Sequence, residues 1–76
     1  MNISIILNSI NDVKSFIKIA GEFNGDIDLI SGRYIIDAKS IMGIFSLDLS
    51  KPITVSIDDR ANADNFLEKI KPFIAN

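Results

Sequence analysis

The chain contains no cysteine and no histidine, and these absences remove most of the side-chain chemistry that small proteins use. Without cysteine there is no disulfide, no thiolate metal site and no cysteine nucleophile. Without histidine the chain lacks the commonest general base and the commonest metal ligand. The neighbouring carboxylates Asp58 and Asp59 have no third ligand beside them, so they indicate a solvated loop. We therefore predict a protein that is not an enzyme and that binds no metal and no other cofactor.

The chain also lacks an excess of one charge and any long hydrophobic run. Eight basic and ten acidic residues give a net charge of -2. This balance argues against nucleic-acid binding, which needs a basic stripe. No apolar run approaches the roughly 20 residues of a membrane span, and the first residues do not resemble a signal peptide. We expect a cytoplasmic protein that contacts neither nucleic acid nor a membrane.

The remaining composition is that of a small globular protein. Of the 76 residues, 47% are apolar, which is enough for one compact core. We predict one domain over residues 1–76. A domain of this size buries only about 60% of the surface that its unfolded chain exposes, so we expect marginal stability.

Three short segments alternate apolar and polar residues, and a fourth is rich in β-branched and aromatic residues; both patterns predict β-strands. The alternating segments comprise residues 3–7, 27–30 and 53–57, and the fourth comprises residues 34–38. Three other segments repeat apolar residues at helical spacing, which predicts helices. They comprise residues 12–22, residues 40–47 and a C-terminal segment that follows Asn62. The order β-α-β-β-α-β-α predicts an α+β domain in which helices cover one face of a four-stranded antiparallel sheet.

Cap residues and helix breakers place the helix ends. Ser9 or Asn11 is expected to cap the first helix and Asn62 the last, because their side-chain oxygens can accept backbone N–H bonds. Pro72 lacks an N–H group and is expected to kink or end the last turn. The middle helix, after Ser40, is expected to be short and poorly placed to share the core.

The segment 39–47 is the most informative part of the chain, because a cap serine precedes more apolar residues than one short helix can bury. We expect Ile44 and Leu47 to pack inward. The remaining apolar side chains should face water, and an exposed apolar cluster is typical of a docking surface. They are Ile41, Met42 and Phe45. The alternative is that all of them share in the core.

The same segment resembles a known family. Lys39-Ser40-Ile41-Met42-Gly43, an aliphatic residue and then Ser46-Leu47 resemble the second-helix motif of the HPr family. These proteins are the phosphocarriers of the bacterial sugar phosphotransferase system. Residues 23–29 are similar to the family's entry into its second strand, without a gap before the serine, and residues 53–57 resemble its fourth strand. The resemblance covers nearly the whole chain and implies an HPr-like open-faced β-sandwich of the order predicted above.

One departure from the family is decisive for function. HPr carries its phosphoryl group on a histidine at the start of the first helix, followed by alanine, arginine and proline. The ungapped match places this segment on residues 9–12, so Ser9 occupies the position of the lost phosphocarrier histidine. A phosphoserine is a low-energy ester and cannot replace a high-energy phosphohistidine. Asp12 adds negative charge where a cation would have to hold the phosphoryl oxygens.

The resemblance also implies a site at the middle helix. In many Gram-positive members a dedicated kinase phosphorylates the serine that matches Ser40, and the product binds a transcriptional regulator. A helix N-terminus favours added phosphate charge through its unpaired N–H groups and its dipole. The family's docking patch for partner proteins falls on Ile41, Met42 and Phe45, and Lys39 could pair with a phosphate or a partner carboxylate. The structural alternatives are a serine that only caps the helix and an ordinary solvated lysine.

These observations predict an HPr-like, non-catalytic regulatory or interaction protein related to the phosphotransferase system, monomeric or weakly dimeric. Its expected partners, by resemblance, are an HPr-type kinase or a transcriptional regulator. One alternative is docking without any phosphorylation. Another is a small-molecule-binding α+β domain whose open sheet face holds a metabolite or a second protomer. A concave apolar pocket would favour that second alternative, and a polar sheet face would disfavour it. Gly43 fits either close approach of a partner or tight packing against the sheet.

Overall fold

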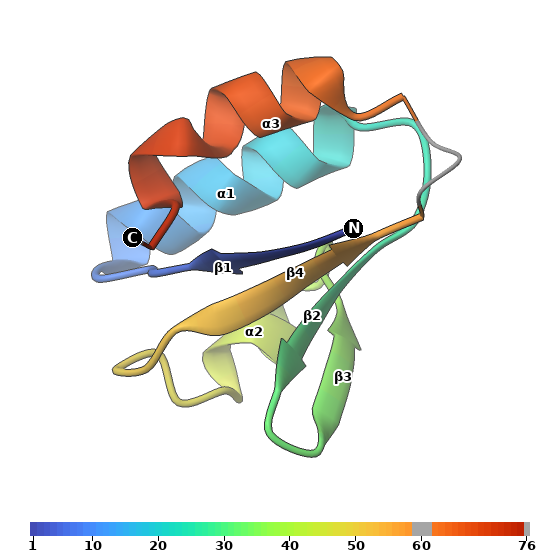
Figure 1. Cartoon of the computed structure of the whole chain (residues 1–76). Helices are drawn as coiled ribbons and strands as arrows, with labels where there is room; N and C mark the ends of the chain where they lie inside the picture. Colours follow the sequence, from blue (N-terminus) through green and yellow to red (C-terminus); the bar gives the residue numbers. More distant parts are fainter. Residues whose placement is uncertain (59–61, 76) are drawn as a thin grey trace.

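The structure is a computed structural model that describes residues 1–58 and 62–75 (Figure 1). Its element order confirms the predicted β-α-β-β-α-β-α sequence, with a short 3-10 turn added after the last helix. The elements are β1 (Asn2–Ile5), α1 (Ile10–Glu22), β2 (Ile27–Ser31), β3 (Tyr34–Asp37), α2 (Ile41–Phe45), β4 (Ile53–Ile57), α3 (Asp64–Ile70) and η1 (Lys71–Phe73). No helix within the described ranges is long and apolar enough to cross a membrane.

The four strands form one antiparallel sheet in the order β1-β4-β2-β3. Figure 1 shows α1 and α3 lying along one another over the same face of this sheet. Alternate strand residues point toward the helices and are buried, because side chains of a strand alternate between its two faces. Ile5, Leu29 and Val55 are fully buried examples from three different strands. The sheet and helices thus form the two-layer α+β arrangement that the sequence predicts.

The three helices contribute to the same core. Phe16 of α1 is fully buried and makes edge-to-face contacts with Phe66 of α3 and Phe73 of η1. The ring centroids lie 6.2 and 6.5 Å apart, respectively. Ile44 of α2 is also fully buried, and Leu47 is 8% exposed. The expectation that the middle helix is poorly placed to share the core is therefore wrong, because its inner side anchors it to the sheet layer.

The C-terminal segment behaves as Pro72 predicts. The α-helix ends at Ile70, and the 3-10 turn η1 contains the proline. The chain then pairs with the outer side of β1. The Ile6 N–H donates to the Phe73 carbonyl at 2.7 Å, and the Ala75 N–H donates to the Ser4 carbonyl at 2.9 Å. This tail closes one edge of the sheet.

Several boundaries differ from the prediction. The first strand ends at Ile5 and α2 ends at Phe45, each two residues before its predicted end. The first helix starts two residues earlier than predicted, because Ser9 rather than Asn11 is its cap. Asn62 is not the cap of α3. Ala63 occupies that position, while the Asn62 side-chain oxygen lies 3.4 Å from the Asp64 N–H.

The predicted solvated loop after β4 falls partly outside the described residues. Asp58 is described and exposed, whereas Asp59 and Arg60 lie outside the described ranges. Groups of three or more possible metal-ligating side chains do not occur among the residues that the structure describes.

Candidate functional site

Ser40 is the cap of α2, and its hydroxyl group is exposed. The Ser40 Oγ accepts the Gly43 N–H at 3.2 Å, and the Ser40 carbonyl accepts the Ile44 N–H at 3.0 Å. The Ser40 N–H donates to the Asp37 carbonyl at 3.0 Å. The first turn of α2 contains no acidic residue. These bonds confirm that Ser40 caps the helix and hold its hydroxyl at a helix start that carries no carboxylate of its own.

The outer side of α2 presents three apolar side chains, which we call the α2 apolar patch. Met42 is 77% exposed, and Ile41 and Phe45 are 41% and 43% exposed. The inner side carries Ile44, which is buried, and Leu47, two residues beyond the end of α2, is buried as well. The predicted division of this helix into inward and outward residues is therefore confirmed. A function of the patch in partner binding stays a prediction.

Gly43 lies on the side of α2 that faces β3. A Cβ atom at this position would meet the Ser40 Oγ at 3.1 Å and the Ile36 Cδ1 at 3.2 Å. Both contacts are tighter than ordinary van der Waals distance, so an alanine here would require the Ser40 and Ile36 side chains to shift by a few tenths of an ångström. Of the two interpretations of Gly43, the structure favours tight packing against the sheet over space for a partner.

Lys39 has partners that neither sequence alternative anticipated. Its Nζ donates to the carbonyls of Phe23 and Gly25 at 3.0 and 3.1 Å. Phe23 is the C-cap residue that directly follows α1. The ammonium group therefore lies at the end of the helix, where the helix dipole favours positive charge. The side chain thus ties the α1–β2 connection to the start of α2. A role of Lys39 toward a partner stays a prediction, and it would require the ammonium group to share or exchange these carbonyls.

The start of α1, where the resemblance places the lost histidine, carries a second cap serine. The Ser9 Oγ accepts the Asp12 N–H at 3.1 Å, and the Asp12 Oδ2 accepts the Asn8 N–H at 3.0 Å. Each of these two bonds satisfies one backbone donor at the helix start. The second goes to the N–H of the residue before the cap, whereas in a capping box it goes to the N–H of the cap residue itself. A carboxylate therefore already occupies the first turn of α1 beside the serine.

One carboxylate beyond the end of α2 has a shifted pKa. The Ser50 side chain and backbone both donate to Asp48, at 2.5 and 3.0 Å, and these bonds lower the pKa of Asp48. Lys51 adds a smaller effect in the same direction. Because the group is exposed, the lowered pKa is a local feature of this turn.

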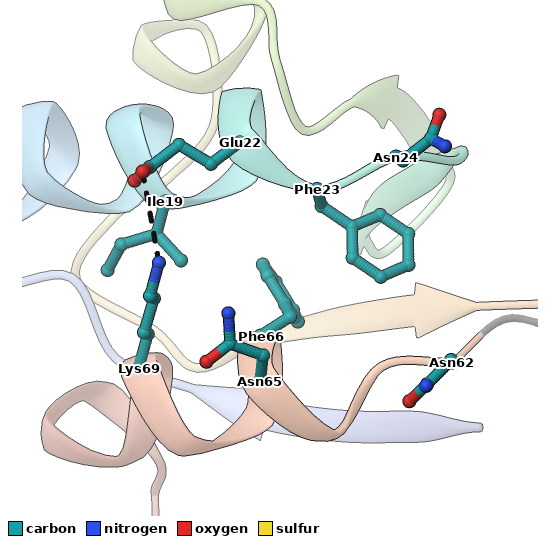
Figure 2. Close-up of a pocket in the computed structure, with 8 residues that line it drawn as sticks. All are labelled: Ile19, Glu22, Phe23, Asn24, Asn62, Asn65, Phe66 and Lys69. Carbon is teal, nitrogen blue, oxygen red and sulfur yellow. Dashed lines mark ion pairs between the residues drawn. The ribbon is translucent and has the colours of Figure 1, made fainter.

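Two cavities lie beside the helices and the β2–β3 turn. The first has a volume of about 150 Å³ and lies between the end of α1 and the start of α3. Figure 2 shows the residues that line it. Glu22 and Lys69 face one another across this cavity, with 3.8 Å between the Glu22 Oε2 and the Lys69 Nζ. The ring centroids of Phe23 and Phe66 lie 5.4 Å apart. A second cavity lies between the β2–β3 turn and the end of α2.

The sheet face turned away from the helices is mainly polar. By strand alternation and register it carries two apolar residues, Ile30 and Ile35, among polar ones. The polar residues are Asn2, Ser4, Asp28, Asp37, Thr54 and Ser56. This composition disfavours the small-molecule alternative, which placed a metabolite on that face.

Comparison with known families gives a match over most of the chain. The family model described as "PTS HPr component phosphorylation site" matches residues 12–76. The chain belongs to the HPr family. The match includes Ser40 and the α2 apolar patch, and it begins after Ser9. HPr proteins are phosphocarriers related to the phosphotransferase system and interact with its proteins, and they are not themselves catalytic enzymes.

Solved HPr structures have the same fold. HPr-C-His from Thermoanaerobacter tengcongensis aligns with a TM-score of 0.72 and 22% identity, over 92% of this chain and 85% of that chain. The phosphocarrier protein HPr from Bacillus anthracis str. Ames aligns with a TM-score of 0.68 and 26% identity, over 99% of this chain and 94% of that chain. The comparison with curated proteins gave no match. The predicted family and the open-faced sandwich are confirmed.

Proposed function

We propose that this HPr-family chain is a regulatory or interaction protein that does not carry phosphohistidine and that is phosphorylated at Ser40. The observation that carries the proposal is the start of α2. There an exposed cap hydroxyl lies in a first turn without acidic residues, on the helix that carries the α2 apolar patch. The chain has no histidine at any position, so the family's phosphohistidine chemistry has no acceptor.

The geometry at Ser40 suits an added phosphate. The Gly43 N–H already points at the Ser40 Oγ from 3.2 Å, and a phosphate would bring further acceptor oxygens to the same helix start. In the transfer, a bond forms between the Ser40 Oγ and the γ-phosphorus of a nucleoside triphosphate. The bond between the γ-phosphorus and the β,γ-bridging oxygen breaks, the nucleoside diphosphate leaves, and the hydroxyl proton passes to a base of the kinase. The added charge would lie beside the α2 apolar patch and change which partners can bind there.

A kinase assay tests this function. We expect a bacterial HPr kinase to add one phosphoryl group, located at Ser40 by mass spectrometry, with complete loss of label in Ser40→Ala. Ser9→Ala, which removes the other cap serine, should keep the label. The absence of label at Ser40 under conditions that modify an authentic HPr would contradict the regulatory proposal.

Docking without phosphorylation is a second candidate, favoured by the exposure of Met42 and Phe45 in the unmodified protein. Its partners would be the same class, a kinase or a transcriptional regulator related to the phosphotransferase system. Under this candidate, Phe45→Ala weakens partner binding and Ser40→Ala does not. Ile10→Ala is a matched control, because Ile10 is an exposed apolar residue on a different helix.

A further inference from the structure

The two edges of the sheet differ in how they are covered. The outer side of β1 pairs with the C-terminal tail through Phe73 and Ala75. The outer side of β3 has no strand partner among the described residues. Two of its side chains, Tyr34 and Ile35, are 69% and 66% exposed. Proteins usually protect an open edge with lysine, proline or a bulge, and the stretch from Tyr34 to Ile36 has neither residue type.

The backbone of Ile35 is the part of this edge that is free to pair. The Ala38 N–H donates to the Ile27 carbonyl at 2.9 Å, and this bond fixes the alternation of the β2–β3 ladder. Ile36 and Tyr34 are then in hydrogen-bonded pairs with β2, and Ile35 lies between them in a non-hydrogen-bonded pair. The N–H and C=O groups of Ile35 therefore point outward from the sheet.

The β2–β3 turn agrees with this alternation. Gly32 has φ +58°, while Arg33, like every non-glycine residue that the structure describes, has a negative φ, so Gly32 and Arg33 form a two-residue turn of type II′. Such a turn is closed by a hydrogen-bonded pair, here Ser31 and Tyr34. Two independent features of the hairpin thus give the same outward direction for the Ile35 backbone.

The sequence of the edge is complementary to itself about Ile35. When two copies pair antiparallel with Ile35 opposite Ile35, their outward N–H and C=O groups exchange hydrogen bonds. In this register Tyr34 lies opposite Ile36 of the partner subunit. Arg33, in the turn directly before β3, is then next to Asp37 of the partner subunit at the end of its strand. Opposite charges at such neighbouring positions attract one another. The two-fold symmetry repeats each of these contacts.

The same pairing would reduce a repulsion between two carboxylates within the monomer. Asp28 and Asp37 are directly opposite across β2 and β3, and both are exposed. Like charges in such positions are destabilising. A guanidinium group from a second copy, placed beside Asp37, would offset this repulsion.

We propose that the outer side of β3 is a homodimer interface, in which two copies join edge to edge into one continuous eight-stranded antiparallel sheet. The proposal concerns a surface other than the α2 apolar patch and does not depend on phosphorylation of Ser40. The four-residue strand makes this a small interface, and small interfaces are weak. The dimer therefore forms in a reversible, concentration-dependent manner.

Sedimentation velocity of the whole chain over a concentration series, up to roughly 1 mM, tests the proposal. We expect a monomer–dimer equilibrium that Ile35→Lys weakens by about tenfold or more, because the lysine places like charges opposite one another at the centre of the edge. Ile10→Lys is the matched control, since Ile10 is 62% exposed and lies on α1. It should leave the equilibrium unchanged. A chain that stays monomeric throughout, or equal weakening by both variants, would overturn the proposal.

A charge exchange tests the register. Arg33→Asp and Asp37→Lys should each prevent self-association, because each places like charges next to one another in the symmetric pair. An equimolar mixture of the two variants should associate again, since both contacts are then between opposite charges. Circular dichroism of each variant checks that the fold is retained. Failure of the folded mixture to associate where the parent chain does would rule out this register.

Discussion

The starts of α1 and α2 use the same cap but surround it differently. In both helices the hydroxyl of the cap serine accepts the N–H of the residue three positions later. Ser9 accepts from Asp12 at 3.1 Å, and Ser40 accepts from Gly43 at 3.2 Å. At α1 that third residue is acidic, and its carboxylate accepts the Asn8 N–H. At α2 it is a glycine without a side chain. The two helix starts therefore share a serine cap and differ in whether an acidic residue lies in the first turn.

The largest expected effect concerns the anchoring of α2. Ile44→Ala should lower the free energy of unfolding by about 2–5 kcal/mol, because Ile44 is fully buried and its removal leaves a cavity. Met42→Ala should change it by no more than about 0.5 kcal/mol, because the side chain is 77% exposed. Urea unfolding monitored by circular dichroism measures both. Similar losses in the two variants would show that α2 is not anchored through its inner side.

An aspartate exchange sharpens the comparison between the two caps. Ser9→Ala and Ser40→Ala should each cost about 1 kcal/mol of stability. Ser40→Asp should recover most of this loss, because a carboxylate can cap the helix and the first turn of α2 has no acidic residue.

Ser9→Asp should instead remain about 0.5 kcal/mol below the parent chain, because its carboxylate lies one turn from that of Asp12. Adding Asp12→Asn to this variant should reduce the deficit. Thermal unfolding at low ionic strength measures all of these changes. Equal recovery by aspartate at both positions would mean that the two helix starts are electrostatically alike.

Lys39 connects the end of one helix with the start of the other, and its removal should have a smaller effect. Lys39→Met keeps most of the side-chain stem but loses the bonds to the Phe23 and Gly25 carbonyls. We expect a loss of about 0.5 kcal/mol, because these are exposed hydrogen bonds. Hydrogen exchange of amides 23–26 should become faster, while Ser40→Ala should leave those amides unchanged. Unaltered exchange in Lys39→Met would contradict the proposed tie between the two segments.

The smallest expected effect lies beyond the end of α2, at Asp48. Its pKa is lowered below the ordinary value of 3.8 in the folded chain, so the charged form stabilises the fold above that pH. The stabilisation is lost as the pH falls below 3.8 through the folded-state pKa. Asp48→Asn should therefore have a flatter dependence of thermal stability on pH between about 6 and 2. Ser50→Ala removes the donating hydroxyl, and its pH dependence of thermal stability should be intermediate between those of the parent chain and Asp48→Asn. An unchanged slope in Asp48→Asn would show that the carboxylate has no such effect.

Much of the fold could be predicted because its signals are local. Period-two alternation identified three of the strands, β-branched and aromatic content identified the one at residues 34–38, and Pro72 marked the end of the last helix. The α2 apolar patch was predicted by counting, since a five-residue helix has too little inner surface for all its apolar side chains. The start of α1 was placed too late because Ile10 is 62% exposed and does not follow the apolar stripe of its helix.

The partners of Lys39 could not be predicted from the sequence, because they lie 14 and 16 residues away along the chain. Backbone carbonyls carry no side-chain signature, so only the folded arrangement shows which ones an ammonium group reaches. The open edge of β3 was missed for a related reason. Whether a strand is central or at an edge depends on the strand order of the sheet, which the local pattern of residues 34–37 does not contain.

The packing around Gly43 has a consequence for how relatives of this chain can diverge. A Cβ atom at position 43 would lie closer than ordinary van der Waals distance to the Ile36 Cδ1 and the Ser40 Oγ. A homologue with alanine at the position of Gly43 must therefore shift these side chains by a few tenths of an ångström, and a shorter side chain at the position of Ile36 would remove one of the two close contacts. Positions 36 and 43 should consequently vary together in an alignment of the family. The Ser40 Oγ is the second close neighbour of position 43. It limits the size of the side chain that position 43 can carry while the helix still begins at the same residue.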